Sequence, residues 1–374
     1  MCGFFGLSNK RKIWVNKFTP STKNIDTDRF GSQLWIKYVQ NPTTVELKQG
    51  NYKPRLTITK RIVEGGIITP LKIEFSVPKL LFGNNFDETE EADFNAVLEK
   101  LLRKLKDMGI YTLRFNLANA KVSAVHFSKN IAFTDYTTSS SIIRELAKID
   151  LTKKLDLTRT KFKNEGHSLQ YYAKSFSVVF YDKIKDLKMP KGRAVEQDNA
   201  LQLNLFEDLN KKPLEILRME VRLCDTRKMK SIFARLSIPE DLTFQAVFKQ
   251  ETAKKVLNLY WQDILDNLIL IKFATSQPID LAETIIKNNG NINLKTALCD
   301  FGALTLINSV GSRRFRQLIN EKYSDRTWQR LKKNLKGLQC SPEGKYQPFL
   351  TITKALDEFK PLKLADFDIN LKVY

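Results

Sequence analysis

The sequence is poor in the residues that build metal clusters and disulfide frameworks. Its four cysteines are far apart and none belongs to a CxxC pair: Cys2, Cys224, Cys299 and Cys340. This spacing excludes a zinc cluster and a disulfide-stapled fold, and it indicates free thiols in a reducing compartment. We therefore expect an intracellular, cytoplasmic protein.

Long hydrophobic runs are also absent. No stretch approaches the roughly 18 uninterrupted apolar residues that a membrane span requires. The start, MCGFFGLSNKRK, lacks the apolar core of a signal peptide. No GxxxxGK[ST] loop occurs either, which argues against a P-loop nucleotidase. We expect no membrane span.

Acidic residues are too few to balance the basic ones. Against 41 Asp+Glu stand 62 Lys+Arg, so the 374-residue chain carries a formal charge of +21 and has a pI near 9.6. Such a chain is drawn to polyanions because neutralised phosphates release condensed counterions. An inert basic protein and a membrane-surface binder are the alternatives. The basic residues are spread along the chain, which favours nucleic acid over a membrane surface.

The first two-thirds of the chain reads as strands with two crossing helices. This pattern predicts an α+β fold, an antiparallel sheet covered by helices. The strands are expected at 53–63, 67–77, 110–117, 122–131, 167–172, 177–183 and 214–223, and the helices at 88–108 and 139–149. Pro78 and the following KLLFGNNF are expected to form a loop.

We expect three successive regions. Residues 1–50 form an N-terminal extension with short strands, residues 51–235 form the sheet domain, and residues 236–374 are helical and basic. In the last region, 252–273 is one long helix candidate. Residues 311–337 read as two short helices with a turn near Tyr323, and Ser324 or Asp325 is positioned to cap the second.

The two short C-terminal helices concentrate positive charge. Their arrangement resembles a helix-turn-helix, which would supply affinity for duplex DNA. The alternative is an ordinary solvated basic face. The candidate DNA-binding residues are Arg313, Arg314, Arg316, Arg326, Arg330, Lys332 and Lys333.

The strand at 177–183 carries a candidate nucleophile. Side chains alternate with period two along a strand, so Tyr181 and Lys183 are expected to share a face. A phenol titrates near pH ~10, so a tyrosine nucleophile needs a nearby cation, which Lys183 can supply. The alternative is that Tyr181 packs in the core, as strand tyrosines often do.

Candidate metal ligands lie in neighbouring predicted strands. The chain has two histidines, His126 and His167, and both are expected in strands of the same sheet. Glu220 lies on the charged face of LRMEVRL, either as part of a solvated face with Arg–Glu pairing or as a carboxylate ligand. Carboxylate and imidazole together can hold Mg²⁺ or Mn²⁺ beside a scissile phosphate. Tyr171 and Tyr172 either pack in the core, stack on bases or provide a second nucleophile.

Four segments, in order, carry a family resemblance. KIEFSVPKLLFGNN, VSAVHFSKN, SVVFYDKIKDL and LRMEVRL resemble the conserved strands of the replication initiators of filamentous phages (the gene II type) and related plasmid rolling-circle initiators. The match runs from about residue 72 to residue 235. Each segment is short, so the resemblance depends on their colinearity.

The resemblance implies a tyrosine nicking endonuclease and strand transferase with a sheet core like that of the HUH and ferredoxin-like folds, in residues 51–235. It gives Tyr181 the nucleophile's position, Lys183 that of the adjacent lysine, and Glu220 that of an acid that binds a divalent metal. His126 stands where the phage proteins carry an aspartate, and His167 has no counterpart. The implied partners are origin DNA, duplex and single-stranded, with a helicase and a polymerase of the host cell.

Two non-enzymatic interpretations remain open. A DNA-binding replication accessory protein or repressor would use the same charge and helices and would not need Tyr181. A packaging protein for single-stranded nucleic acid would use Tyr171 and Tyr172 to stack on bases. Covalent, metal-dependent attachment to DNA separates the enzyme from both.

Overall fold

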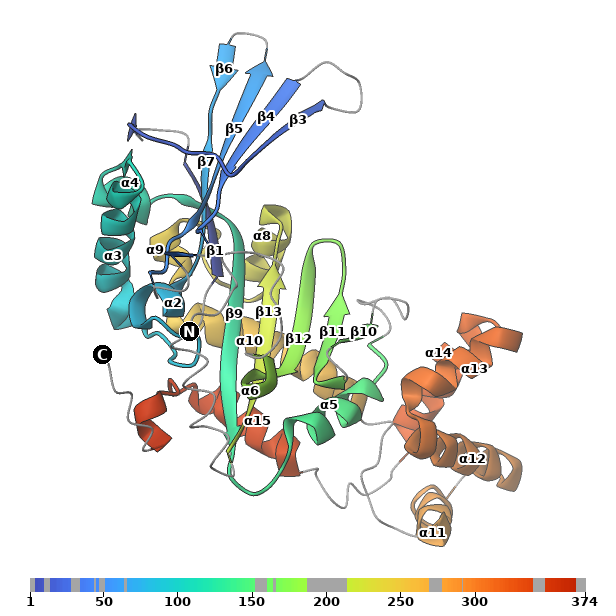
Figure 1. Ribbon diagram of the computed structural model, residues 1–374. Coiled ribbons are helices and arrows are strands. Elements are labelled where there is room, and N and C mark those ends of the chain that lie inside the picture. The colour runs from blue at the N-terminus through green and yellow to red at the C-terminus, as the bar shows by residue number, and fades with distance from the viewer. Residues whose placement is uncertain are drawn as a thin grey trace. The chain divides into compact units, whose positions relative to one another are not determined.

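The computed structural model describes most of the chain, in two compact units that are each discontinuous in sequence (Figure 1). The first contains residues 1–136, 174–257 and 359–374, and the second contains residues 137–173 and 258–358. These boundaries differ from the three successive regions expected from the sequence. The described residues are 4–9, 14–27, 34–43, 45–46, 51–63, 66–151, 160–163, 166–186, 214–268, 278–290, 292–338 and 347–367.

The first unit is built on an antiparallel sheet. Its strand order is β12 (Phe176–Asp182), β13 (Glu215–Leu223), β9 (Lys121–Phe133), β1 (Phe4–Asn9), β7 (Leu71–Ser76), β5 (Arg55–Val63), β4 (Leu34–Gln40) and β3 (Thr22–Thr27), with β6 (Gly66–Ile68) beside β5. A separate ribbon pairs β2 (Trp14–Val15) with β8 (Ile110–Tyr111). The prediction of a mixed α and β fold with an antiparallel sheet is therefore confirmed.

Three described strands from within residues 1–50 belong to this sheet: β1, β4 and β3. Strand β1 pairs with β9 on one side and with β7 on the other, so it lies in the middle of the sheet. It joins the two halves of the sheet, which are otherwise separated in the strand order. Strands β3 and β4, also within residues 1–50, extend the sheet beyond β5.

The two faces of the sheet differ in polarity. One face is apolar and carries Phe75, Phe127 and Met219, all fully buried. Helices α8 (Thr226–Arg235) and α9 (Phe244–Val247) contact its strands, and the rings of Phe75 and Phe244 meet edge to face at 5.8 Å. Burial of such side chains is the main stabilising term for the unit. The opposite face carries polar side chains.

Three local predictions in this unit are wrong. The segment after β7, expected as a loop, forms α2 (Val77–Phe82), because Pro78 is tolerated in the first helical turn and Gly83 ends the helix at φ 74°. The strand expected at 110–117 ends after β8, and α4 (Arg114–Ala118) follows it. The strand expected at 67–77 is broken at Pro70 into β6 and β7.

One helix prediction in this unit is confirmed in type. The helix expected at 88–108 is α3 (Phe94–Asp107), preceded by a 3₁₀ turn η1 (Glu91–Asp93). Gly109, at φ 78°, turns the chain after it. Strand β12 continues into the short helix α6 (Lys183–Asp186), and a 3₁₀ turn η5 (Leu364–Phe367) lies near the end of the described chain.

The second unit is mostly helical. It contains α5 (Ser139–Ala147), the paired strands β10 (Thr160–Lys163) and β11 (Ser168–Tyr172), α11 (Pro278–Asn288), α12 (Leu294–Val310), α13 (Ser312–Lys322), α14 (Asp325–Gly337) and α15 (Gln347–Glu358). Helix α10 (Gln250–Leu268) begins in the first unit and ends in the second. The predicted pair of short helices is α13 and α14, and Ser324 occupies the N-cap position of α14. In the part of the chain described here, no helix is long and apolar enough to cross a membrane.

Candidate active site

Three adjacent strands bring the candidate residues together on the polar face of the sheet. Pairing across β12, β13 and β9 places Tyr181 opposite Arg218, and Arg222 opposite His126. Since directly paired residues point to the same side, Tyr181, Glu220 and His126 share one face. The hydroxyl of Tyr181 donates a hydrogen bond to Oε2 of Glu220 at 3.0 Å.

Glu220 is the centre of this cluster. Its other carboxylate oxygen, Oε1, lies 3.1 Å from Nδ1 of His126 and 2.9 Å from Nε of Arg222. Burial raises the pKa of Glu220, but the Arg222 guanidinium and the contact with His126 outweigh it and hold the pKa well below its usual range. Glu220 is therefore ionised at neutral pH. The Arg–Glu pairing that the sequence allowed is present, but Glu220 is buried and not solvated.

Tyr181 is protonated at neutral pH. Its side chain is buried, and burial together with the charge of Glu220 raises its pKa well above the ordinary value, while Arg218 opposes this increase. Nη1 of Arg218 lies 3.5 Å from the phenol oxygen. As a nucleophile, Tyr181 would have to give up its proton during attack, and Glu220 is the acceptor already in contact with it.

Lys183 is placed differently from the expectation. Strand β12 ends at Asp182 and Lys183 begins α6, so the period-two alternation does not extend to it. Its Nζ is buried, 5.9 Å from the centroid of the Tyr181 ring and 3.7 Å from Asp186. Arg218, which is not among the candidate residues predicted from the sequence, is a cation at the phenol oxygen itself. Its signal in the sequence was its position two residues before Glu220.

The two histidines occupy different compact units. His126 is in β9 of the first unit, whereas His167 lies in a turn directly before β11 of the second, not in a strand as expected. Nδ1 of His167 lies 2.7 Å from Oγ of Ser140 in α5. The structure thus brings His126 to Glu220 and gives His167 a local partner.

His126 and Glu220 fit two neighbouring ligand positions of a divalent cation. Octahedral ligands at roughly 2.1 Å from a metal lie about 3 Å from one another, close to the observed separation of Nδ1 and Oε1. Imidazole with carboxylate fits Mn²⁺ better than Mg²⁺, which takes oxygen ligands. Among the residues that the structure describes, no third His, Cys, Asp or Glu joins this pair, so water or substrate oxygens would fill the remaining positions.

Tyr171 is poorly suited to a second nucleophilic role. It is 1% exposed, and its hydroxyl donates to the backbone carbonyl of Leu146. Burial raises the pKa of Tyr171 well above its usual range. Core packing, the alternative that the sequence left open, describes Tyr171. Tyr172 is half-buried at the end of β11.

The basic residues of α13 and α14 fall into two groups. Arg316 is buried, with Nη2 at 2.6 Å from Asp325 and Nη1 at 3.3 Å from Asp150. Lys332 is also buried and donates to the side chain of Asn267 at 2.8 Å. The side chains of Arg316 and Lys332 therefore stabilise the second unit through contacts within it. Arg313 is half-buried, and the exposed members are Arg314, Arg326, Arg330 and Lys333.

Comparisons with known proteins give no relative. No protein-family model matches the chain, no curated protein matches it, and no solved structure matches the fold.

Proposed function

We propose that the protein is a rolling-circle replication initiator that nicks one DNA strand at an origin, with Tyr181 as the nucleophile. The observation that carries the proposal is the contact chain from Tyr181 through Glu220 to His126 across β12, β13 and β9. In this proposal the phenol of Tyr181 is the nucleophile, and the Glu220 carboxylate in contact with it is the proton acceptor. The imidazole of His126 lies on the same carboxylate and forms a cation site with it. The colinear resemblance from about residue 72 to residue 235 supports the same assignment.

The proposed reaction is a phosphoryl transfer. Oη of Tyr181 attacks the phosphorus and forms a P–O bond, its proton passes to Glu220, and the bond from phosphorus to the 3′-oxygen breaks. That oxygen takes up a proton and becomes a free 3′-OH, which can prime a polymerase, while the 5′-phosphate stays on Tyr181. In the later joining step a 3′-OH attacks the phosphotyrosine and releases the phenol. One ester replaces another, so no nucleotide is consumed.

Cations would stabilise the charge that develops in this step. Arg218 lies at the attacking oxygen, and Arg222 is partly exposed beside Glu220, so both are placed for the oxygens of a phosphate. A divalent cation bound by His126 and Glu220 would add Lewis-acid polarisation of the phosphate. Arg222 also contacts Oε1 of Glu220, so such a cation would compete with that ion pair.

Duplex affinity is assigned to the second unit. Arg314, Arg326, Arg330 and Lys333 are exposed on two consecutive helices. Exposed guanidinium and ammonium groups bind DNA phosphates and release counterions.

A non-catalytic DNA-binding protein is the second candidate. The observation that favours it is the burial of Tyr181, whose hydroxyl is already hydrogen-bonded and whose pKa is raised. In that case the Tyr181–Glu220 contact is a core hydrogen bond and the exposed residues of α13 and α14 carry the whole function.

A covalent-adduct assay separates the two candidates. The protein is incubated with Mn²⁺ or Mg²⁺ and single-stranded oligonucleotides that tile its own replicon, and the products are separated on a denaturing gel. The comparison variants are Tyr181→Phe and Tyr172→Phe. We expect an adduct with the wild type and with Tyr172→Phe and none with Tyr181→Phe.

The remaining outcomes also discriminate. An adduct that persists in Tyr181→Phe assigns the nucleophile elsewhere. Duplex binding without an adduct from any fragment, in either metal, supports the non-catalytic DNA-binding protein.

A further inference from the structure

A row of three residues crosses the sheet at the Tyr181 hydroxyl. Tyr181, Arg218 and Asn130 are directly opposite one another on β12, β13 and β9, so their side chains point to the same face. Nε of Arg218 donates to Oδ1 of Asn130 at 2.6 Å, and Nη1 lies 3.5 Å from the phenol oxygen. Nη2 donates to the backbone carbonyl of Asn85. The guanidinium is thus fixed at two nitrogens, and the third is directed at Tyr181.

Both the side-chain amide and the backbone N–H of Asn130 are hydrogen-bonded. It is 1% exposed, its Nδ2 donates to the carbonyl of Phe86 at 2.8 Å, and its backbone N–H donates to Oε1 of Glu88. With Oδ1 occupied by Arg218, both ends of the amide are engaged, and its orientation is set by these partners. The position of Asn130, and with it that of the Arg218 guanidinium, therefore depends on the segment that contains Glu88.

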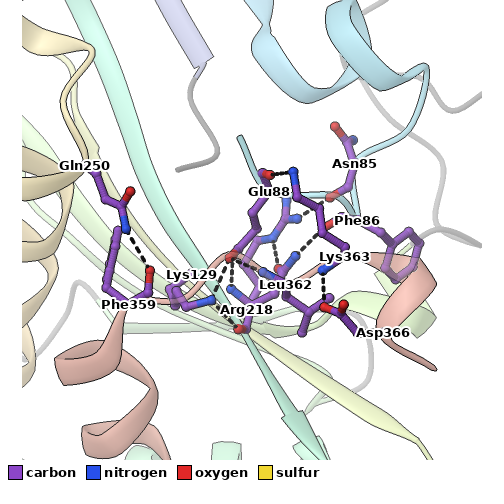
Figure 2. A network of polar contacts seen from close by, with 11 residues as sticks. Asn85, Phe86, Glu88, Lys129, Arg218, Gln250, Phe359, Leu362, Lys363 and Asp366 are labelled. Atoms are coloured by element: carbon purple, nitrogen blue, oxygen red, sulfur yellow. Dashed lines mark hydrogen bonds and ion pairs between the residues drawn. The ribbon is translucent and has the colours of Figure 1, made fainter. Parts of the chain in front are cut away.

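Glu88 connects this row to the C-terminal strap, residues 359–363. Figure 2 shows Glu88 between Lys129 and the strap residues Leu362 and Lys363. Glu88 is 0% exposed; its Oε2 accepts from Nζ of Lys129 at 2.6 Å and from the amide of Leu362 at 3.0 Å. Its backbone N–H donates to Leu362 O at 3.0 Å, and Nζ of Lys363 donates to Glu88 O at 2.8 Å.

The strap is far away in sequence. It is 274 residues beyond Glu88, after the chain has passed through residues 258–358 of the second unit and returned to the first. Gln250, just before that excursion, donates to the carbonyl of Phe359 at 3.1 Å, which fixes the returning chain (Figure 2). The row of Tyr181, Arg218 and Asn130 is thus supported by residues that follow the second unit in the sequence.

We propose that Asn130, held by Glu88 and the C-terminal strap, is a positioning residue that fixes the Arg218 guanidinium beside the Tyr181 hydroxyl. The proposal rests on the proposed function only in giving Tyr181 the role of nucleophile. Asn130 acts through Arg218, so its loss displaces a cation from the developing charge without removing a group that contacts DNA. The strap makes that arrangement dependent on the complete fold of the first unit.

The test compares Asn130→Ala with Asn119→Ala, an exposed asparagine of the same unit whose side chain donates to the Phe115 carbonyl. For Asn130→Ala we expect single-turnover adduct formation to fall about a hundredfold, the effect of a small misplacement of a catalytic group. The oligonucleotide KM and the circular dichroism spectrum should match the wild type. Asn130→Asp, which keeps an acceptor for Arg218, should recover part of the rate. Asn119→Ala should behave as wild type.

A second readout needs no DNA. The Nε–H group of Arg218 is observed by ¹⁵N NMR and assigned with Arg218→Lys. Because this group donates to Oδ1 of the buried Asn130, its exchange with solvent should be slow in the wild type and faster in Asn130→Ala. Lys363→Met, which removes one contact of the strap, should also speed the exchange, and Lys106→Met, at an exposed lysine of α3, should not.

The two proposals fail in different ways. If Asn130→Ala forms adduct at the wild-type rate and its Arg218 Nε–H exchanges as slowly as in the wild type, Asn130 is not a positioning residue. If the wild type forms no adduct at all, the proposed function fails, and the exchange of the Arg218 Nε–H alone decides whether Asn130 positions Arg218.

Discussion

The phenol oxygen of Tyr181 lies 3.0 Å from Oε2 of Glu220, and the two side chains come from neighbouring antiparallel strands. Their pKa values shift in opposite directions, since the pKa of Tyr181 is raised by burial and by the Glu220 charge, whereas that of Glu220 is lowered by Arg222 and His126 against the effect of burial. The proton thus stays on the phenol and the charge on the carboxylate. Under the proposed function, this relationship would supply both a hydrogen-bonded nucleophile and its proton acceptor. Four predictions concern the residues around it and in the second unit.

Replacing Tyr181 with Phe should abolish the adduct and cost little stability. The ring remains to fill the core, and Glu220 keeps His126 and Arg222 as partners. Loss of one buried hydrogen bond typically lowers the free energy of unfolding by about 1 kcal/mol. Denaturant titration measures this quantity. A loss several times larger would show that Tyr181 is chiefly a structural residue.

Replacing Glu220 with Gln should slow adduct formation about a hundredfold or more, because the phenol loses its proton acceptor. In the variant, the free energy of unfolding should also fall less steeply than in the wild type as the pH is lowered into the acid range. The folded pKa of Glu220 is lowered, so its stabilisation is present above the unfolded value near 4.5 and is lost as the pH falls through the folded pKa. Unfolding measured between pH 7 and pH ~3 checks this, and equal slopes for variant and wild type would contradict it.

Two arginines of the C-terminal helices should separate stability from DNA binding. Arg316 is buried between Asp150 and Asp325, so Arg316→Ala should lower the free energy of unfolding by about 3 kcal/mol or more. Arg330 is exposed on α14, so Arg330→Ala should leave stability unchanged and reduce the salt slope of duplex binding by about 1. Thermal unfolding and fluorescence anisotropy over a salt series measure the two effects. Equal effects of both variants on stability would contradict the assignment.

Gly311 should be intolerant of any side chain. It joins α12 to α13 at φ 85°, and a Cβ there would lie 2.7 Å from Cβ of Lys148. Gly311→Ala should therefore lower the free energy of unfolding by about 2 kcal/mol. The control is Gly337→Ala, where a Cβ meets nothing within 4 Å, and this change should be neutral or mildly stabilising. A neutral Gly311→Ala would show that the backbone relaxes there.

Regular patterns made much of the fold predictable. Apolar residues at helical spacing predicted α3, and strand alternation predicted β9, β12 and β13, which carry the candidate site. The position of Tyr181 and Glu220 on one face follows from the period of a strand. The sequence could not show which strands are neighbours, because pairing depends on contacts far apart in the chain.

The remaining features depend on tertiary context. Strand β1 is short and looks like an unremarkable N-terminus, yet it lies mid-sheet between β9 and β7. Asn130 and Glu88 carry no pattern of their own, and their roles appear only when the C-terminal strap returns to meet Glu88. At Lys183 a local pattern predicted too much, because the strand expected at 177–183 includes the first residue of α6.

The most direct test of the central assignment is mass spectrometry of the protease-digested adduct. The wild type, incubated with Mn²⁺ and an oligonucleotide from its replicon, should yield a peptide in which a 5′-phosphonucleotide is attached to Tyr181, together with a free 3′-OH fragment. The same nucleotide on another residue, or no modified peptide under conditions in which the duplex is bound, would contradict the account.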